Sequence, residues 1–190
     1  MLYTLGYASP LGPITLASDG RHIIGLWLEG QKYFAATVKG MVEQKSEVPV
    51  LAFTGRWLDA YFAGEKPAIG ELPLAPSGSD FRKAVWDILC KIPYGQLTTY
   101  GEIAKEMASL LNRKSMSSQA VGGAVGHNPI SIIIPCHRVV GASGSLTGYA
   151  GGIARKIKLL QLEGVDITSL SLPVLKTSAQ ERKTVNDQQK

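Results

Sequence analysis

Hydrophobic and polar positions alternate in the first part of the chain. The alternation runs through residues 2–7, and two further strand-like runs follow at 14–18 and 23–28, separated by the dipeptide Asp19-Gly20. A period of two residues is typical of strands with one buried face, and an Asp-Gly pair is a common hairpin turn. The pattern therefore predicts an antiparallel β-meander.

The apolar period then changes to that of a helix. Large apolar residues fall on one helical face at Leu51, Trp57, Leu58, Tyr61 and Phe62, with Gly64 just beyond them. The stretch ELPLAPSGSD, residues 71–80, is rich in Pro, Ser and Gly, which is typical of a linker. We expect a small N-terminal α/β domain over residues 1–75.

Beyond the linker the pattern is helical. The apolar period predicts a helix over residues 81–92, with Ser79 or Asp80 as its N-cap. Thr99 and Glu102 have the spacing of a capping box and open a second helix. The predicted buried face of this second helix consists of Ile103, Ala104, Met107 and Leu111.

A third predicted helix is short and contains two adjacent glycines. It covers residues 119–125 after a polar stretch, so the second and third helices resemble a helix-turn-helix. Gly122 and Gly123 each cost a helix about 1 kcal/mol relative to alanine. Tight packing between helices would explain them, and so would close approach of a partner such as a nucleic-acid strand.

These patterns together predict the fold class α/β (α+β), with a mostly helical C-terminal domain over residues 80–166.

Composition and charge narrow the classes of function. The chain has 190 residues, of which 45% are hydrophobic, and a formal net charge of +5. Residues 81–160 hold 10 Lys and Arg against 3 Asp and Glu, which suggests a polyanionic partner, although a solvated basic face has the same composition. No apolar run reaches the roughly 18 residues of a membrane span, and the N-terminus has no signal sequence. We expect a cytoplasmic protein without a membrane partner.

The chain has only two cysteines, which are too few for a disulfide framework. Together with three histidines they form no cluster at zinc-ligand spacing, so we expect no metal. Cys90 lies within the predicted helix over residues 81–92, where a small core side chain is the ordinary interpretation.

The second cysteine, Cys136, stands between a proline and a histidine in the stretch IIIPCHRVVG. The apolar run 132–134 predicts a buried strand that ends at Pro135 and presents Cys136 to a cleft. A reactive thiolate needs a base or a positive environment, and His137 is adjacent. Adjacent side chains often point apart, however, and a buried thiol beside a surface histidine is the commoner arrangement.

The sequence around this cysteine resembles that of a known family. IPCHRVVG is preceded by AVGGAVGHNP and followed by GSLTGYAGGI and KLLQLEG. This series is similar to that of the O6-alkylguanine-DNA alkyltransferases, also called methylated-DNA–protein-cysteine methyltransferases. The match is dense over residues 81–164, whereas residues 1–75 match in layout alone.

The resemblance implies the same fold and a DNA repair activity. A protein of this family flips O6-alkylguanine, chiefly O6-methylguanine, out of duplex DNA and transfers the alkyl group to its own cysteine, here Cys136. The thioether is permanent, so each molecule acts once, and no cofactor is needed. The resemblance also implies that the glycine pair faces DNA.

Three residues would support the thiol by this resemblance. His137 would accept the thiol proton through a water, and Glu163 would fix the tautomer of that histidine in the manner of a triad. Asn128 would join the helix-turn-helix to the acceptor site by hydrogen bonds. Considered alone, a glutamate near a helix end is usually a solvated side chain.

Other residues would bind the base and the DNA by the same resemblance. Tyr149 would donate to the guanine ring, the backbone N–H of Ala150 would bond O6, and Tyr100 would assist rotation of the nucleotide. The DNA-binding helix would present Gln119, Ala120, Gly122 and Gly123. Many family members have an arginine where this chain has Gln119, and glutamine lacks the charge that an arginine would add.

Two other classes of protein share part of the pattern. A DNA-binding regulator or alkyl-base sensor would use the helix-turn-helix and the basic segment without any transfer, but such sensors lack the acceptor cysteine. A cysteine hydrolase would share the cysteine, histidine and acid, but it gives no reason for the glycine pair. We expect a monomer that binds alkylated duplex DNA, with a polar and disordered tail over residues 167–190.

Overall fold

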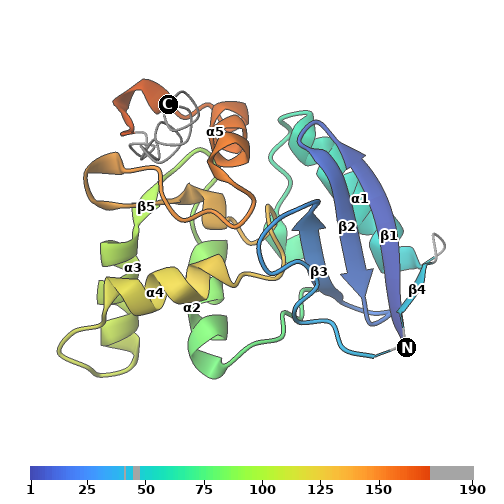
Figure 1. Cartoon of the computed structure of the whole chain (residues 1–190), viewed down its shortest axis with the longest axis horizontal. Coiled ribbons are helices and arrows are strands. Elements are labelled where there is room, and N and C mark those ends of the chain that lie inside the picture. Colours follow the sequence, from blue (N-terminus) through green and yellow to red (C-terminus); the bar gives the residue numbers. More distant parts are fainter. Residues whose placement is uncertain (41, 45–47, 172–190) are drawn as a thin grey trace, which may run out of the picture.

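The computed structural model describes residues 1–40, 42–44 and 48–171. A β-sheet with one long helix lies beside a group of helices (Figure 1). The elements in chain order are β1 (Leu2–Ser9), β2 (Gly12–Ser18), β3 (Ile23–Leu28), β4 (Val42–Gln44), α1 (Pro49–Phe62), η1 (Ile69–Glu71), α2 (Asp80–Cys90), β5 (Thr98–Thr99), α3 (Tyr100–Leu110), α4 (Ser118–Gly126), η2 (Cys136–Arg138), β6 (Val139–Val140), η3 (Ala142–Gly144), α5 (Ile153–Leu162) and η4 (Ile167–Ser169), where η marks a 3-10 helix. This mixed architecture confirms the predicted fold class.

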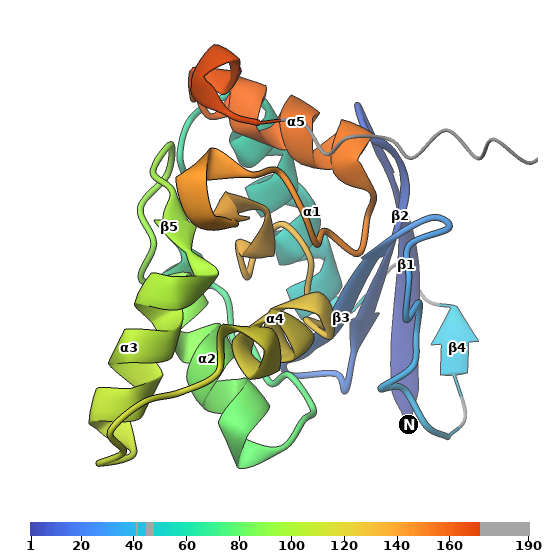
Figure 2. The ribbon, with the colours of Figure 1, turned by 60° about the vertical axis from the view of Figure 1, so that its left-hand side comes forward.

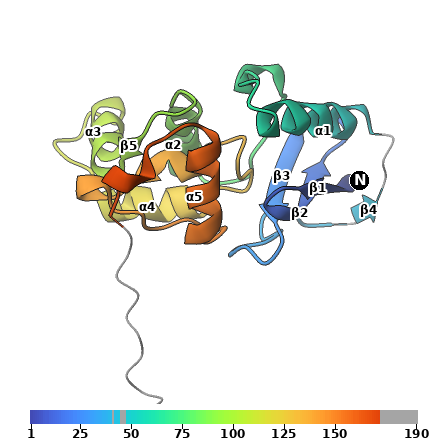
Figure 3. The same cartoon turned by 90° about the horizontal axis from the view of Figure 1, so that it is seen from above.

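The predicted meander is present as β1, β2 and β3, which pair antiparallel. A fourth strand, β4, pairs parallel with β1 and gives the order β3-β2-β1-β4. Its three residues are all exposed, so no apolar alternation marked it in the sequence. Helix α1 lies along one face of the sheet (Figure 3). Its buried face includes Leu51, Trp57, Leu58 and Tyr61, as predicted.

The outer edge of β3 is paired with two later parts of the chain. Leu74, within the predicted linker, forms a parallel bridge with Ile23, and Ile130 forms one with Leu26. The linker is therefore fixed to the sheet in its first half. The second bridge matters more for the site, because it holds the segment just before the cysteine motif against the N-terminal sheet.

Side chains cap three helices of the second part at their starts. Ser79 caps α2 and Ser117 caps α4, while Thr99 and Glu102 form the predicted capping box of α3. The buried face of α3 consists of Ile103, Ala104, Met107 and Ala108. Leu111 was predicted on this face and is 44% exposed, because α3 ends at the preceding residue and Leu111 leaves the helical path.

Helix α4 packs against both α2 and α3 (Figure 2). The indole N–H of Trp86 on α2 donates to the backbone oxygen of Ala124 at 2.9 Å and fixes α4 in place. Helices α3 and α4 with the polar turn between them form the predicted helix-turn-helix. Within the described ranges, Gln119, Ala120 and Gly123 are exposed on the outer side of α4.

One hydrophobic core runs through the sheet part and the helical part. The predicted tail over residues 167–190 begins too early, because η4 is ordered and Ser171 forms a bridge with Ser145. Leu170 packs on a small second cluster around Leu146 and Leu160, and this packing explains the order. The rest of the predicted tail, 172–190, lies outside the described residues. Within the described ranges, no helix has the length and apolar character that crossing a membrane requires.

Candidate active site

Cys136 follows a buried turn, so the strand predicted over residues 132–134 is wrong. Ile132 has a φ of 70°, a left-handed conformation that strands do not contain. The backbone N–H of Cys136 donates to Ile134 O at 2.8 Å, and η2 begins at the cysteine. The isoleucines are apolar because the turn is buried where the sheet and the helices meet, and a short apolar run cannot distinguish this turn from a buried strand.

The side chain of Asn128 connects the end of α4 to the thiol. Its Nδ2 lies 3.1 Å from Sγ of Cys136 and donates to Ile134 O at 2.8 Å, while its Oδ1 accepts from Ile130 N at 2.9 Å. These bonds place the thiol against the last residues of the helix-turn-helix. The role predicted for Asn128 in alkyl transfer stays a prediction.

The thiol of Cys136 is buried and therefore protonated at rest. Burial raises the pKa of Cys136 above its ordinary value, and the N–H of Asn128 and the nearby ammonium of Lys156 oppose this rise only in part. Since the thiolate is the nucleophilic form, a base must take the proton when the site reacts.

His137 is fully buried, and its Nε2 lies 2.7 Å from Oε1 of Glu163. Burial lowers the pKa of His137, so the imidazole is neutral near pH 7. Although burial of Glu163 works the other way, the hydrogen bonds and charges of His137 and Arg138 hold the pKa of that carboxyl well below its usual range. A carboxylate can only accept, so Nε2 carries the proton and Nδ1 keeps a free lone pair.

Nδ1 of His137 is buried and has no hydrogen-bond partner among the described residues. A buried acceptor without a donor is costly, so this atom is suited to a proton or to a bridging water. Glu163 reaches the histidine from the C-cap of α5, and Gly164 follows with a φ of 78°, as the predicted helix end requires.

A cavity of about 390 Å³ opens between α4 and the loop that precedes α5. Tyr149 and Ala150 line one side of it, and Gly122 and Gly123 line the other. Tyr149 is 8% exposed, and its hydroxyl has no hydrogen-bond partner in the part of the chain that the structure describes. Its ring meets the ring of His137 edge-on at 6.5 Å, so the cavity adjoins the buried histidine.

Tyr100 sits at the first turn of α3 and reaches the same loop. Its hydroxyl donates to Thr147 O at 3.2 Å. Gly148 has a φ of 74°, and a Cβ atom there would lie 2.5 Å from the Tyr100 hydroxyl oxygen. Only glycine permits this close approach, which brings Tyr100 against the wall of the cavity.

The exposed side of α4 carries the four residues predicted to bind DNA. Gln119 and Ala120 are exposed in its first turn. Gly122 would place a Cβ 3.8 Å from the ring of Tyr100, an ordinary contact, and no atom of the described residues lies within 4 Å of that position at Gly123. Tight packing among the described residues therefore does not explain the glycine pair.

Two family profiles match most of the chain. The 6-O-methylguanine DNA methyltransferase ribonuclease-like domain matches residues 1–76, and the DNA binding domain of the same methyltransferase matches residues 80–165. The chain belongs to the 6-O-methylguanine DNA methyltransferase family. The predicted resemblance is thereby confirmed, and it extends to the N-terminal part that matched only in layout.

Family relatives match over nearly their whole length. The methylated-DNA–protein-cysteine methyltransferase of Methanosarcina acetivorans is 45% identical, over 86% of this chain and 99% of that protein. The protein of the same name from Haemophilus influenzae is 43% identical, over 86% of this chain and 87% of that protein. The crystal structure of Mycobacterium tuberculosis OGT in complex with DNA is similar with a TM-score of 0.72 and 40% identity, over 89% of this chain and 94% of that one.

Sequence reasoning missed three side chains that complete this family member's site. Nε of Arg138 donates to Oε2 of Glu163 at 2.8 Å, and the Tyr61 hydroxyl donates to Oε1 at 2.7 Å. Nζ of Lys156 is fully buried and donates to the backbone oxygens of Val139 and Thr147, and burial lowers its pKa to about 8.

The sequence signals for these three side chains were weak. Arg138 directly follows the histidine in the cysteine motif. Tyr61 carried only a core-face pattern, and a buried lysine has no sequence signal of its own.

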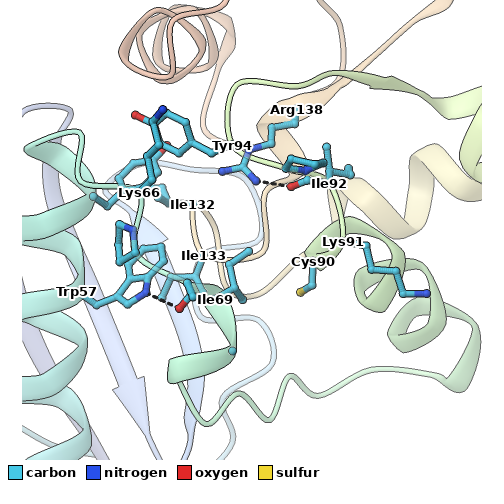
Figure 4. Close-up of a pocket in the computed structure, with 15 residues that line it drawn as sticks. Trp57, Lys66, Ile69, Cys90, Lys91, Ile92, Tyr94, Ile132, Ile133 and Arg138 are labelled. Carbon is cyan, nitrogen blue, oxygen red and sulfur yellow. Dashed lines mark hydrogen bonds between the residues drawn. The ribbon is translucent and has the colours of Figure 1, made fainter.

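Cys90 is half-buried and packs against the hydrophobic core, which confirms the predicted core position in part. It lies at the end of α2 on the wall of a cleft of about 290 Å³ between the sheet part and the helical part (Figure 4). Arg138 and Tyr94 line another part of this cleft. Burial raises the pKa of the Cys90 thiol to about 11, so Cys90 is a poor nucleophile at neutral pH.

Proposed function

We propose that this chain is a methylated-DNA–protein-cysteine methyltransferase that repairs O6-alkylguanine in duplex DNA by transfer of the alkyl group to Cys136. The observation that carries the proposal is the buried Cys136 thiol, which Asn128 contacts at 3.1 Å beside the His137–Glu163 pair at 2.7 Å. The printed names of the relatives from Methanosarcina acetivorans and Haemophilus influenzae agree with this activity.

The transfer is a displacement at a saturated carbon. The Cys136 proton passes to Nδ1 of His137 through a water, and Glu163 stabilises the imidazolium that forms. The thiolate attacks the alkyl carbon, so that a sulfur–carbon bond forms as the bond between carbon and O6 breaks. The guanine keeps that electron pair and takes up a proton, so the net change is one thiol and one alkylguanine to one thioether and one guanine.

The cavity beside Tyr149 is proposed to hold the flipped base. The unpartnered hydroxyl of Tyr149 is available to donate to the guanine ring. The backbone N–H of Ala150 is proposed to bond O6 as negative charge develops there. A base that fills this cavity would displace the water that stabilises the thiolate and slows its attack.

The exposed side of α4 is proposed to bind DNA through Gln119, Ala120, Gly122 and Gly123. The absence of atoms around Gly123 lets a nucleic-acid backbone come close to the helix. Flipping the nucleotide costs a few kcal/mol, and Tyr100 at the cavity wall is placed to assist the rotation. The relative from Mycobacterium tuberculosis was crystallised with DNA, in agreement with a DNA partner.

Intact mass separates this function from the alternatives. The wild-type protein is incubated with duplex DNA that contains one O6-methylguanine, and its mass is then measured. We expect a gain of one methylene group, located on Cys136 by peptide mapping. A DNA-binding regulator or sensor would bind the duplex and keep its mass, and a cysteine hydrolase would also return to its original mass.

Other features of the proposed function stay predictions. The protein is expected to act as a monomer in the cytoplasm, without a cofactor. Within the described ranges, no group of three His, Cys, Asp or Glu side chains could hold a metal ion. Metal analysis of the purified protein tests the prediction that it binds none.

A further inference from the structure

Tyr61 of α1 reaches from the sheet part of the molecule into the candidate active site. Its side chain is 1% exposed, and its hydroxyl donates to Oε1 of Glu163 at 2.7 Å. The same hydroxyl oxygen lies 3.5 Å from Nε2 of His137. The hydroxyl therefore lies where the acid and the histidine meet, although Tyr61 is far from both in the sequence.

The carboxylate of Glu163 is saturated with donors. Oε1 accepts from His137, from the Tyr61 hydroxyl and from Nη2 of Arg138, while Oε2 accepts from Nε of Arg138 and from the backbone of Gly95. Among these donors Tyr61 alone comes from the first 76 residues. The others belong to the helical part, so among the described hydrogen bonds of this carboxylate the one from Tyr61 connects the acid to the N-terminal domain.

The ring of Tyr61 packs against two aromatic side chains, which orient its hydroxyl. It stacks on Trp57 with centroids 5.6 Å apart and planes 7° apart, and it meets Tyr94 edge-on at 5.9 Å. The indole N–H of Trp57 donates to Ala68 O at 3.0 Å, which fixes the stacking partner. Figure 4 shows Trp57, Tyr94 and Arg138 around the cleft that adjoins this cluster.

The Tyr61 hydroxyl remains a protonated donor at neutral pH. Burial and the negative charge of Glu163 raise the pKa of Tyr61 far above its ordinary value. A neutral donor on Oε1 withdraws negative charge from the carboxylate and fixes the direction in which this oxygen faces the histidine. Both effects tune how strongly Glu163 holds the proton on Nε2.

We propose that Tyr61 is a positioning residue for proton transfer from Cys136, through Glu163 and His137, so that the N-terminal domain completes the acceptor site. This inference rests on the proposed transfer to Cys136. Without the hydroxyl, Oε1 of Glu163 is less firmly directed at Nε2, so the neutral tautomer of His137 that accepts the thiol proton is held less well. Glu163 also becomes more basic, so His137 is protonated at a higher pH on the acidic limb, and the cation cannot accept the thiol proton.

Several charged and titratable groups face His137, and the variant Tyr61→Phe changes one of them. Glu163 and Arg138 face it from α5 and η2, Lys156 acts from α5, and Tyr149 lies against its ring. The Cys136 thiol is adjacent in the chain, and Tyr61 faces the histidine from α1. Tyr61→Phe changes this last group alone and keeps the aromatic packing.

The test measures single-turnover transfer from duplex DNA with O6-methylguanine as a function of pH. We expect Tyr61→Phe to transfer about tenfold more slowly at pH 7, because a hydrogen bond to a charged group is lost. The acidic limb of the pH–rate profile should move upward by roughly one pH unit. Affinity for DNA should be unchanged, since α4 is untouched. Transfer from O6-methylguanine as a free base should be slowed by the same factor as transfer from duplex DNA.

A matched control is a tyrosine on β1 whose hydrogen bond ends on the same helix as Tyr61. Tyr7 donates to the exposed carboxylate of Asp59 on α1 at 2.7 Å, the same length as the bond from Tyr61 to Glu163. Tyr7→Phe removes an equivalent bond away from the site and should keep the wild-type rate and profile. Melting temperatures of both variants separate a loss of fold from a loss of positioning.

A double-mutant cycle decides whether Tyr61 acts through Glu163. In a Glu163→Gln background the added change Tyr61→Phe should alter the slow residual rate by less than twofold. An equal loss in both backgrounds would show that Tyr61 only supports the fold and would overturn the inference. A wild-type rate and pH profile for Tyr61→Phe would overturn it as well. If the wild-type protein itself gains no methyl group, the proposed function fails, and that result is distinguishable from either outcome.

Discussion

The substitution Glu163→Gln tests the proton relay most severely. Its carboxylate accepts five hydrogen bonds from four residues, and two of these donors are the buried His137 and Arg138. An amide has one acceptor oxygen and one N–H₂ group. If the oxygen stays with the guanidinium, the N–H₂ group faces Nε2 of His137 and selects the tautomer with its proton on Nδ1.

In that tautomer Nδ1 carries the proton, so it has no lone pair to accept the proton of Cys136. The wrong tautomer in a serine-histidine-aspartate triad costs about 10⁴-fold in rate, and we expect a loss of about 10³- to 10⁴-fold here. The buried charge of Arg138 also loses its partner, which costs about 3 kcal/mol of unfolding free energy and lowers the melting temperature by roughly 6–12 °C.

The assay is single-turnover transfer at 25 °C, well below the lowered melting temperature, with DNA affinity measured in parallel. Asp59→Asn is the control, because it neutralises a carboxylate that accepts a tyrosine hydroxyl at 2.7 Å on the protein surface. The control should keep the wild-type rate, and both proteins should bind DNA normally. A Glu163→Gln rate within twofold of wild type would refute the role of Glu163 in the relay.

Three further predictions concern other parts of the molecule. Gln119→Arg should tighten DNA binding and steepen its salt dependence by about one counterion. Gln119→Ala should slow repair of duplex DNA more than repair of the free modified base, which needs no flipping. Equal slowing of both substrates would show that Gln119 has no part in the flipping step. Cys90→Ala should transfer at the wild-type rate in the same assay, because the raised pKa keeps that thiol protonated; a slowed variant would contradict this. The pKa of Glu163 is depressed in the folded state, so its stabilisation is fully present above the unfolded value of about 4.3 and is lost as the pH falls further. Urea unfolding of Glu163→Gln should therefore depend less on pH than that of the wild type below about pH 4.3, and parallel curves would contradict the shift.

Local sequence signals predicted the elements that carry the site. The capping box at Thr99 and Glu102 begins α3 as expected, and Gly164 ends α5 with a positive φ. Such signals act within a few residues, so each can be recognised without knowledge of the rest of the fold. The exposed start of α4, including Gln119, likewise agrees with the prediction.

Features that depend on distant contacts could not be predicted. Residues 132–134 are apolar because two parts of the molecule bury them, and the left-handed φ of Ile132 has no sequence signal in a β-branched residue. The partner of Tyr61 is 102 positions away, so periodicity placed this tyrosine in the core without its hydrogen bond. Leu111 continues the apolar period of α3, but its helix ends one residue earlier.

The central claim is that Cys136 itself becomes alkylated. The most direct measurement is the intact mass of wild-type protein, Cys136→Ala and Cys90→Ala after incubation with duplex DNA that contains one O6-methylguanine. The account predicts one added methylene in the wild type and in Cys90→Ala, none in Cys136→Ala, and DNA binding by all three. An unchanged wild-type mass, or a methylene that persists in Cys136→Ala, would contradict it.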